Sequence, residues 1–247
     1  MLKRILTLIM IFLSLGQETV RQYEDQLSLG GTLFLVNKEY MIGADYVPDD
    51  LVMPDVRKSS SAVLMRKEAA AALEELFAAA KEEKLNLVAV SGYRSYQTQR
   101  AIYNRRRRAA GQAHVNRFVA VPGASEHQLG LAMDVSRTKS SGLKASFGKT
   151  KEGMWLSENC YRFGFILRYK QEWEEVTGYG YEPWHIRYVG VEHALRIREL
   201  DIPFEEYVEA LRQLKDEELQ EEDRTDEESL PIADRAVDDL MRHTVLR

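Results

Sequence analysis

The sequence has a single cysteine, Cys160, among its 247 residues. This scarcity excludes a disulfide framework within the chain and a zinc site made only of cysteines. Proline and glycine are also few, at 6 and 15 residues, which excludes collagen-like and low-complexity chains. The remaining composition, 45% hydrophobic and 30% charged, is that of an ordinary globular protein. A metal site in this chain would therefore have to use histidine and carboxylate ligands.

The N-terminus carries an apolar run, residues 5–15, directly after Lys3 and Arg4. This run of about 11 residues is shorter than the ~20 that a membrane-spanning helix needs, and the short basic segment before it is typical of a secretory signal. We therefore expect residues 1–16 to be a signal peptide or an N-terminal anchor, followed by a lead-in over residues 17–32. The protein is then exported and acts in the cell envelope, with membrane contact only through an uncleaved N-terminal segment.

Acidic residues are concentrated at the other end of the chain. Residues 205–247 hold 15 Asp and Glu against 6 Lys and Arg, which leaves 24 against 28 for residues 1–204 because the totals are 39 and 34. The sequence thus predicts a solvated acidic tail over residues 215–247, with a linker at 220–229. Residues 33–214 remain as one domain that is long enough to bury its own core.

Hydrophobic periodicity predicts an α+β fold for this domain, with helices packed around a small antiparallel sheet. Residues 62–84 are rich in Ala, Leu and Glu, which favours a helix there. Ser95 is a suitable N-cap for the next helix. The predicted helices cover residues 62–84, 96–111 and 154–163, and the predicted strands cover residues 87–90, 131–135, 165–169 and 184–189.

Two of the five histidines lie in segments rich in other functional groups. Catalytic zinc takes three protein ligands, and His127, Asp134 and His185 can supply two imidazoles and a carboxylate. Asp134 lies in an otherwise apolar strand, where an unpaired carboxylate is costly and a metal would remove that cost. Glu182, three residues before His185, could move a proton beside the metal without ligating it. Spacing alone leaves open that both histidines are structural.

Ser-x-His-x-x-Gly-x-Ala-x-Asp covers residues 125–134, and Glu-x-Trp-His-x-Arg-Tyr covers residues 182–188. Together these motifs resemble the zinc D-alanyl-D-alanine carboxypeptidases of the VanY type. Ser-Gly-Tyr-Arg-Ser at residues 91–95, with Gln99, also matches, and the resemblance extends in order over roughly residues 33–200.

The resemblance implies a role for eight residues. Zn²⁺ would bind to His127, Asp134 and His185, with Glu182 as the catalytic base and Arg94 stabilising the substrate oxyanion. Ser125, Gln99 and Tyr93 would line the pocket for the terminal residue of the peptide. The implied enzyme is a zinc carboxypeptidase that removes the terminal D-Ala from peptidoglycan stem peptides. We expect it to be a monomer.

Other functions are weighed against this one. An L,D-carboxypeptidase acting on tetrapeptide stems is the nearest rival, and a non-catalytic peptidoglycan-binding protein is a second. A serine acyl-enzyme is disfavoured because the Ser-x-x-Lys matches crowd one polar loop and no Lys-Thr-Gly follows them. The basic run at residues 105–108 lacks interleaved aromatics, so it is interpreted as a solvated helix face, with no nucleic acid partner. Cys160 is interpreted as a core residue.

Overall fold

The computed structural model describes residues 24–60, 63–139 and 142–229, with side chains described up to residue 216. The chain divides into two compact units, of which Asp25–Val208 is the larger. The predicted signal peptide or anchor at residues 1–16 lies outside the described residues. Within the described part of the chain, no helix is both long enough and apolar enough to cross a membrane.

The larger unit is built on a four-stranded sheet in which every neighbouring pair is antiparallel, so the predicted α+β class is confirmed. The strand order is β3-β4-β6-β5, which places β4 and β6 at the centre. A two-stranded sheet, β1 with β2, lies outside it. The strands are β1 Leu51–Val52, β2 Met65–Arg66, β3 Val88–Ser91, β4 Ala132–Ser136, β5 Phe165–Leu167 and β6 His185–Tyr188.

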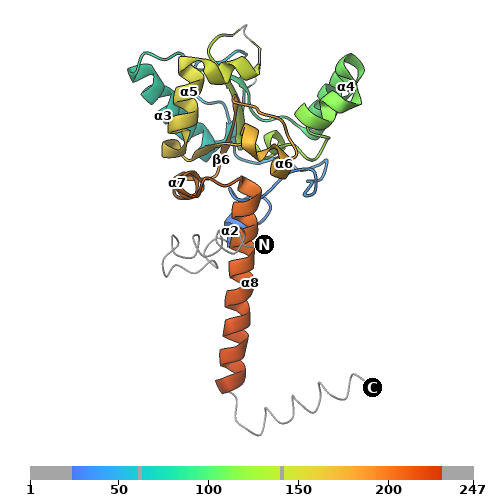
Figure 1. The fold of residues 1–247 in the computed structure, drawn as a ribbon, viewed down its shortest axis with the longest axis vertical. Coiled ribbons are helices and arrows are strands. Elements are labelled where there is room, and N and C mark those ends of the chain that lie inside the picture. Colours follow the sequence, from blue (N-terminus) through green and yellow to red (C-terminus); the bar gives the residue numbers. More distant parts are fainter. Residues whose placement is uncertain (1–23, 61–62, 140–141, 230–247) are drawn as a thin grey trace. The chain divides into compact units, whose positions relative to one another are not determined.

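Helices surround this sheet, with α3 and α5 on one side and α4 standing apart on the other (Figure 1). The α-helices are α2 Glu24–Leu27, α3 Lys67–Glu82, α4 Tyr96–Phe118, α5 Lys151–Asn159, α6 Glu174–Thr177, α7 Val191–Leu200 and α8 Phe204–Ser229. Short 3₁₀ helices are η2 Glu126–Leu129, η3 Ala145–Lys149, η4 Cys160–Phe163 and η5 Gln171–Trp173.

The core lies between α3 and the sheet. Leu73, Leu76 and Phe77 follow one face of α3 at helical spacing and are buried together with Met133 of β4 and Ile186 of β6. Each fully buried side chain of this size contributes about 1.5–3 kcal/mol relative to exposure. Cys160 is part of the same core, where burial raises the pKa of its thiol to about 12, so its interpretation as a core residue is confirmed.

Two helix boundaries differ from the prediction by five residues or more. Helix α3 begins at Lys67, five residues later than expected, because Met65 and Arg66 pair with β1. Helix α4 begins at the predicted cap, where the Ser95 side chain accepts a hydrogen bond from the Thr98 N–H. It breaks at Gly111, whose φ is 82°, but a further helical stretch continues to Phe118.

The prediction of a linker at residues 220–229 is wrong, because these residues form part of helix α8. The charge of this stretch suggested a solvated chain. Yet residues 204–229 include neither Gly nor Pro and are rich in Glu, Gln, Arg and Leu, which are strong helix formers. High charge therefore does not prevent local helix formation.

Candidate metal centre

The register of the two central strands brings a carboxylate and an imidazole together. Asp134 of β4 and His185 of β6 are direct partners in the antiparallel ladder, so their side chains project from the same face. The Oδ1 atom of Asp134 lies 3.3 Å from Nδ1 of His185. Both residues are buried, with 3% of their surface exposed.

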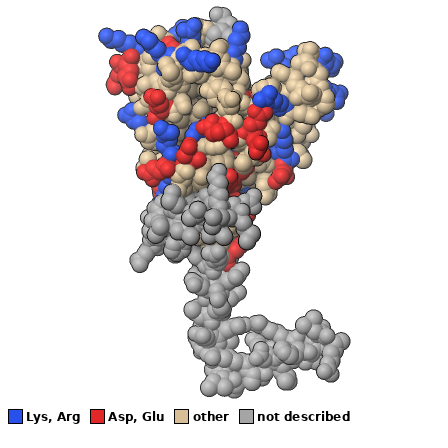
Figure 2. Space-filling model, in the orientation of Figure 1, with Lys and Arg blue, Asp and Glu red and all other residues tan. Residues whose placement is uncertain are grey.

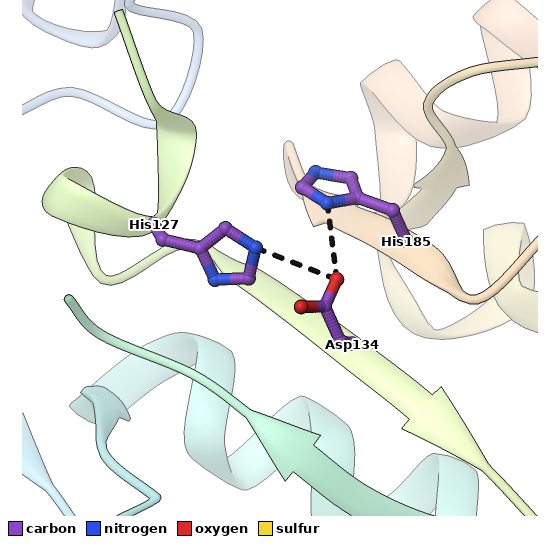
Figure 3. A group of neighbouring side chains, drawn as sticks. All are labelled: His127, Asp134 and His185. Carbon is purple, nitrogen blue, oxygen red and sulfur yellow. Dashed lines mark ion pairs between the residues drawn. The ribbon is translucent and has the colours of Figure 1, made fainter. Parts of the chain in front are cut away.

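The third side chain comes from the turn before β4. His127 lies on η2, which ends at Gly130 in the left-handed conformation (φ 69°), and the chain then enters β4. The Nε2 atom of His127 lies 3.4 Å from Oδ1 of Asp134, and both histidine rings face this oxygen (Figure 3). The ligand atoms of the three residues all lie within 4.8 Å of one another. The structure thus assembles the predicted ligand set.

The outer nitrogen of each ring has its own partner. Nδ1 of His127 lies 2.7 Å from the Gly92 carbonyl oxygen, and Nε2 of His185 lies 3.1 Å from Oε2 of Glu126. Each partner is an acceptor, so each outer nitrogen carries the proton and the inner nitrogen of the neutral ring keeps its lone pair. Nε2 of His127 is buried without a hydrogen-bond partner in the described structure. A metal ion coordinated by the inner nitrogens and Asp134 would satisfy this orphaned atom, so the residues fit zinc.

Gly92 is required at the turn that orients His127. A Cβ atom at this position would lie 2.2 Å from the Leu64 carbonyl oxygen, which is too close for any other residue. The turn follows an irregularity in β3 between Ala89 and Ser91, and such bulges redirect the chain near functional sites. The glycine therefore lets the main chain come close enough to hold the imidazole.

The surroundings of the two histidines shift their pKa values in opposite directions. Burial, followed by the charge of Arg94, lowers the pKa of His127 to about 4, so its ring is neutral at pH 7. Burial also disfavours the charged form of His185, but its hydrogen bonds to Asp134 and Glu126 outweigh this and raise its pKa to about 9. Burial opposes ionisation of Asp134, yet the pKa of its carboxyl is held well below the usual range by His127, His185 and Arg94.

Glu126 is the main site residue that the sequence analysis missed. Its carboxylate is fully buried, and Oε1 accepts hydrogen bonds from Arg168 Nε at 2.8 Å and Arg187 Nη1 at 3.1 Å. Arg168 also donates to Glu205 at 2.9 Å. The available signal was the placement of charged residues inside apolar segments, since buried charges need partners. By holding Oε1, the two arginines fix the carboxylate whose other oxygen, Oε2, faces His185.

Glu182, the predicted base, is a buried residue of the cleft. It lines the same cleft as the three ligand residues, and its main-chain N–H donates to the Tyr169 carbonyl oxygen. Burial raises the pKa of its carboxyl to about 8, although the charge of His185 opposes this shift. A carboxyl group with a pKa near neutrality can both accept and return a proton at physiological pH.

Arg94 is held by the site and faces it. Its Nη1 donates to Oε1 of Gln99 at 3.0 Å, and its Nη2 lies 3.5 Å from Oδ2 of Asp134. Gln99 in turn donates to the Ala120 carbonyl oxygen at 2.7 Å. The amide oxygen of Gln99 thus holds the guanidinium, and its amide nitrogen fixes Gln99 to the main chain.

A cleft of about 400 Å³ contains these groups. Of the predicted site residues, Arg94, Gln99, Ser125, Glu182 and the three ligands line it, whereas Tyr93 does not. The main-chain N–H of Tyr93 donates to the Leu64 carbonyl oxygen beside the glycine turn. The volume suits a small ligand or the end of a peptide.

Comparison with known proteins agrees with the geometry. Residues 62–191 match the family model described as VanY, D-alanyl-D-alanine carboxypeptidase. The protein YodJ of Bacillus subtilis is 44% identical over 81% of this chain and 72% of its own length. The solved structure of the LdcB LD-carboxypeptidase is 47% identical, covers 71% of this chain and 85% of its own, and superimposes with a TM-score of 0.66. A variant of the vancomycin resistance D,D-pentapeptidase VanY in complex with Zn(II) is 36% identical, covers 72% and 98%, and gives a TM-score of 0.61.

Proposed function

The chain belongs to the VanY family of D-alanyl-D-alanine carboxypeptidases, and from this membership we propose that it removes the terminal D-Ala from peptidoglycan stem peptides. The enzyme is a carboxypeptidase with Zn²⁺ as its cofactor. The observation that supports the proposal most strongly is the buried set of His127, Asp134 and His185, in which each imidazole has its outer nitrogen tied to an acceptor.

We assign the metal ligands and the base as follows. His127 Nε2, Asp134 and His185 Nδ1 would hold the ion. When bound, Zn²⁺ supplies a Lewis acid that polarises the scissile carbonyl and lowers the pKa of a water molecule toward about 7. Glu182 accepts a proton from the attacking water and afterwards donates it to the amine of the leaving amino acid.

Arg94 stabilises the charge that develops on the carbonyl oxygen. Its guanidinium is fixed by Gln99 and lies next to Asp134, so it needs no reorganisation during the reaction. A donor fixed in this way is worth roughly 3–4 kcal/mol of the barrier. Gln99 acts by positioning Arg94, and Ser125 contributes to the wall against which the terminal residue packs.

Cleavage of an L,D bond in tetrapeptide stems is the second candidate. Its support is the 47% identity to the LdcB LD-carboxypeptidase, which exceeds the 36% identity to the D,D-pentapeptidase VanY. We assign the same ligand set, base and arginine to either reaction, so the choice between them depends on the shape of the cleft. In either case we propose action in the cell envelope after export directed by residues 1–16.

Mass spectrometry of synthetic stem peptides tests the proposal. The zinc-loaded protein is incubated with a pentapeptide ending in D-Ala-D-Ala and separately with the tetrapeptide, each with and without a chelator. Chelator-sensitive loss of one D-Ala from the pentapeptide is the expected result. Loss from the tetrapeptide alone would replace it with the L,D activity. Binding of either peptide without cleavage would identify a non-catalytic protein and overturn both.

A further inference from the structure

The residues that line the cleft are buried at its floor and exposed to solvent at its mouth. The ligand residues and Glu182 at the floor are all at most 9% exposed. Arg106 and Lys144 line the same cleft but are exposed to solvent, so they lie at its mouth. Because the wall peptide is attached to a large polymer, only its terminal residue can occupy the buried floor. The part of the peptide on the amino-terminal side of the scissile bond must leave through the mouth.

The mouth carries positive charge from two separate elements. Arg106 belongs to α4, whose residues include six arginines and no Asp or Glu, and Lys and Arg side chains gather over α4 in Figure 2. Lys144 precedes η3, in a different part of the chain. Among the described residues, neither side chain has an ion-pair partner.

The carboxylates of the cleft do not neutralise these cations. Glu126, Asp134 and Glu182 are the acidic residues that line it, and all three are buried at the floor. Glu126 is held by two arginines, and Asp134 by two histidines and Arg94. Among the described residues that line the cleft, Arg106 and Lys144 are therefore the exposed charged groups.

We propose that Arg106 and Lys144 bind free carboxylates of the substrate on the amino-terminal side of the scissile bond. The preferred substrates are then stem peptides whose internal carboxyl groups are free, and peptides with these groups converted to amides are poorer. This inference rests on the proposed carboxypeptidase function, since it takes the floor of the cleft as the position of the terminal residue. An exposed charge pair changes affinity by about threefold, so two such pairs give about tenfold.

The proposal is tested by a double-mutant cycle in which charges are removed from the protein and from the peptide, singly and together. Two pentapeptides are compared, one with every internal carboxyl group free and one with the same groups amidated. The proteins are the wild type, the double variant Arg106→Gln with Lys144→Gln, and the matched control Arg105→Gln, which removes a neighbouring exposed charge of α4 that does not line the cleft.

For the wild type we expect a KM about tenfold lower for the carboxylate peptide, with kcat unchanged. The double variant should lose this preference through a higher KM for the carboxylate peptide alone, and the control should keep it. Equal changes of KM for both peptides, or no preference in the wild type, would overturn the proposal. Calorimetric binding to zinc-loaded Glu182→Gln protein gives the same comparison without turnover. If neither peptide is cleaved, the proposed function fails, and the two affinities still decide the inference.

Discussion

The Nε2 atom of His185 lies 3.1 Å from Oε2 of Glu126, and this contact decides which nitrogen of His185 faces Asp134. Glu126 cannot rotate away, because its other oxygen is held by Arg168 and Arg187. A carboxylate behind a metal-binding histidine fixes the orientation of the ring and raises its basicity as a ligand. The geometry of the inner site therefore depends on charges that never touch the substrate.

Glu126→Gln is expected to weaken zinc binding by about 10–100-fold, because an amide oxygen is a weaker acceptor for the His185 N–H. Competition with a chromophoric chelator measures the affinity. The change also leaves two buried arginines less compensated, so thermal unfolding is recorded in parallel and only folded protein is titrated. The exposed Glu158→Gln serves as the control. Zinc affinity equal to that of the control would show that Glu126 has no positioning role.

Glu182→Gln is expected to keep zinc but to lower kcat by about 10²–10⁴-fold, because the amide cannot accept the proton of the attacking water. Burial raises the pKa of Glu182 to about 8, so the neutral amide resembles the carboxyl present at pH 7 in metal-free protein and leaves stability nearly unchanged. Metal analysis and peptide turnover are measured on the same sample. Near-normal turnover at full zinc occupancy would remove Glu182 from the mechanism.

His193, on α7, is expected to make the stability of the protein depend on pH. Its ring lies against Tyr207 and Gln26, and burial lowers its pKa to about 4 from an unperturbed value of 6.5. The unfolded chain thus binds the proton first, so the contribution of His193 is complete above pH 6.5 and is lost as pH falls toward 4. The loss amounts to about 3 kcal/mol.

The His193→Gln variant isolates this effect, because glutamine keeps hydrogen-bonding capacity without titrating. Denaturant unfolding of metal-free protein at pH 7 and pH 4.5 should show a smaller fall in stability for the variant than for the wild type. Equal falls in the two proteins would mean that His193 is not protonated on unfolding in this range.

Truncation after Gln220 is expected to leave cleavage intact, within about twofold in kcat/KM. Every proposed ligand, the base Glu182 and the arginine Arg94 lie in the unit Asp25–Val208. The peptide assay applied to the shortened chain provides the check. A folded but inactive truncation would assign a role in catalysis to the acidic tail.

Features with a strong local cause could be predicted from the sequence. The Ser95 cap and the central strands both follow from local rules. The start of α3 could not be predicted, because Met65 and Arg66 are helix formers that a partner strand distant in sequence recruits. Pairing across the chain overrides local propensity there.

The ligand set could be proposed from residue types and the resemblance, but its surroundings could not. Glu126 stands at the unspecified position of the Ser-x-His motif, and only the fold brings it to His185. Tyr93 lies next to Arg94 in sequence yet does not line the cleft, and its main-chain N–H donates to the Leu64 carbonyl oxygen. Adjacency in sequence and adjacency in the site are independent here.

The pairing of Asp134 with His185 makes zinc binding depend on the register between β4 and β6. Side chains alternate between the two faces of a strand, so a slip of one residue between β4 and β6 would send the carboxylate and the imidazole to opposite faces. A chain misaligned in this way could retain its helices and much of its apolar burial, yet it would have lost a complete coordination sphere. Stoichiometric zinc uptake is therefore a direct assay of correct strand alignment, and it separates native molecules from compact misfolded ones.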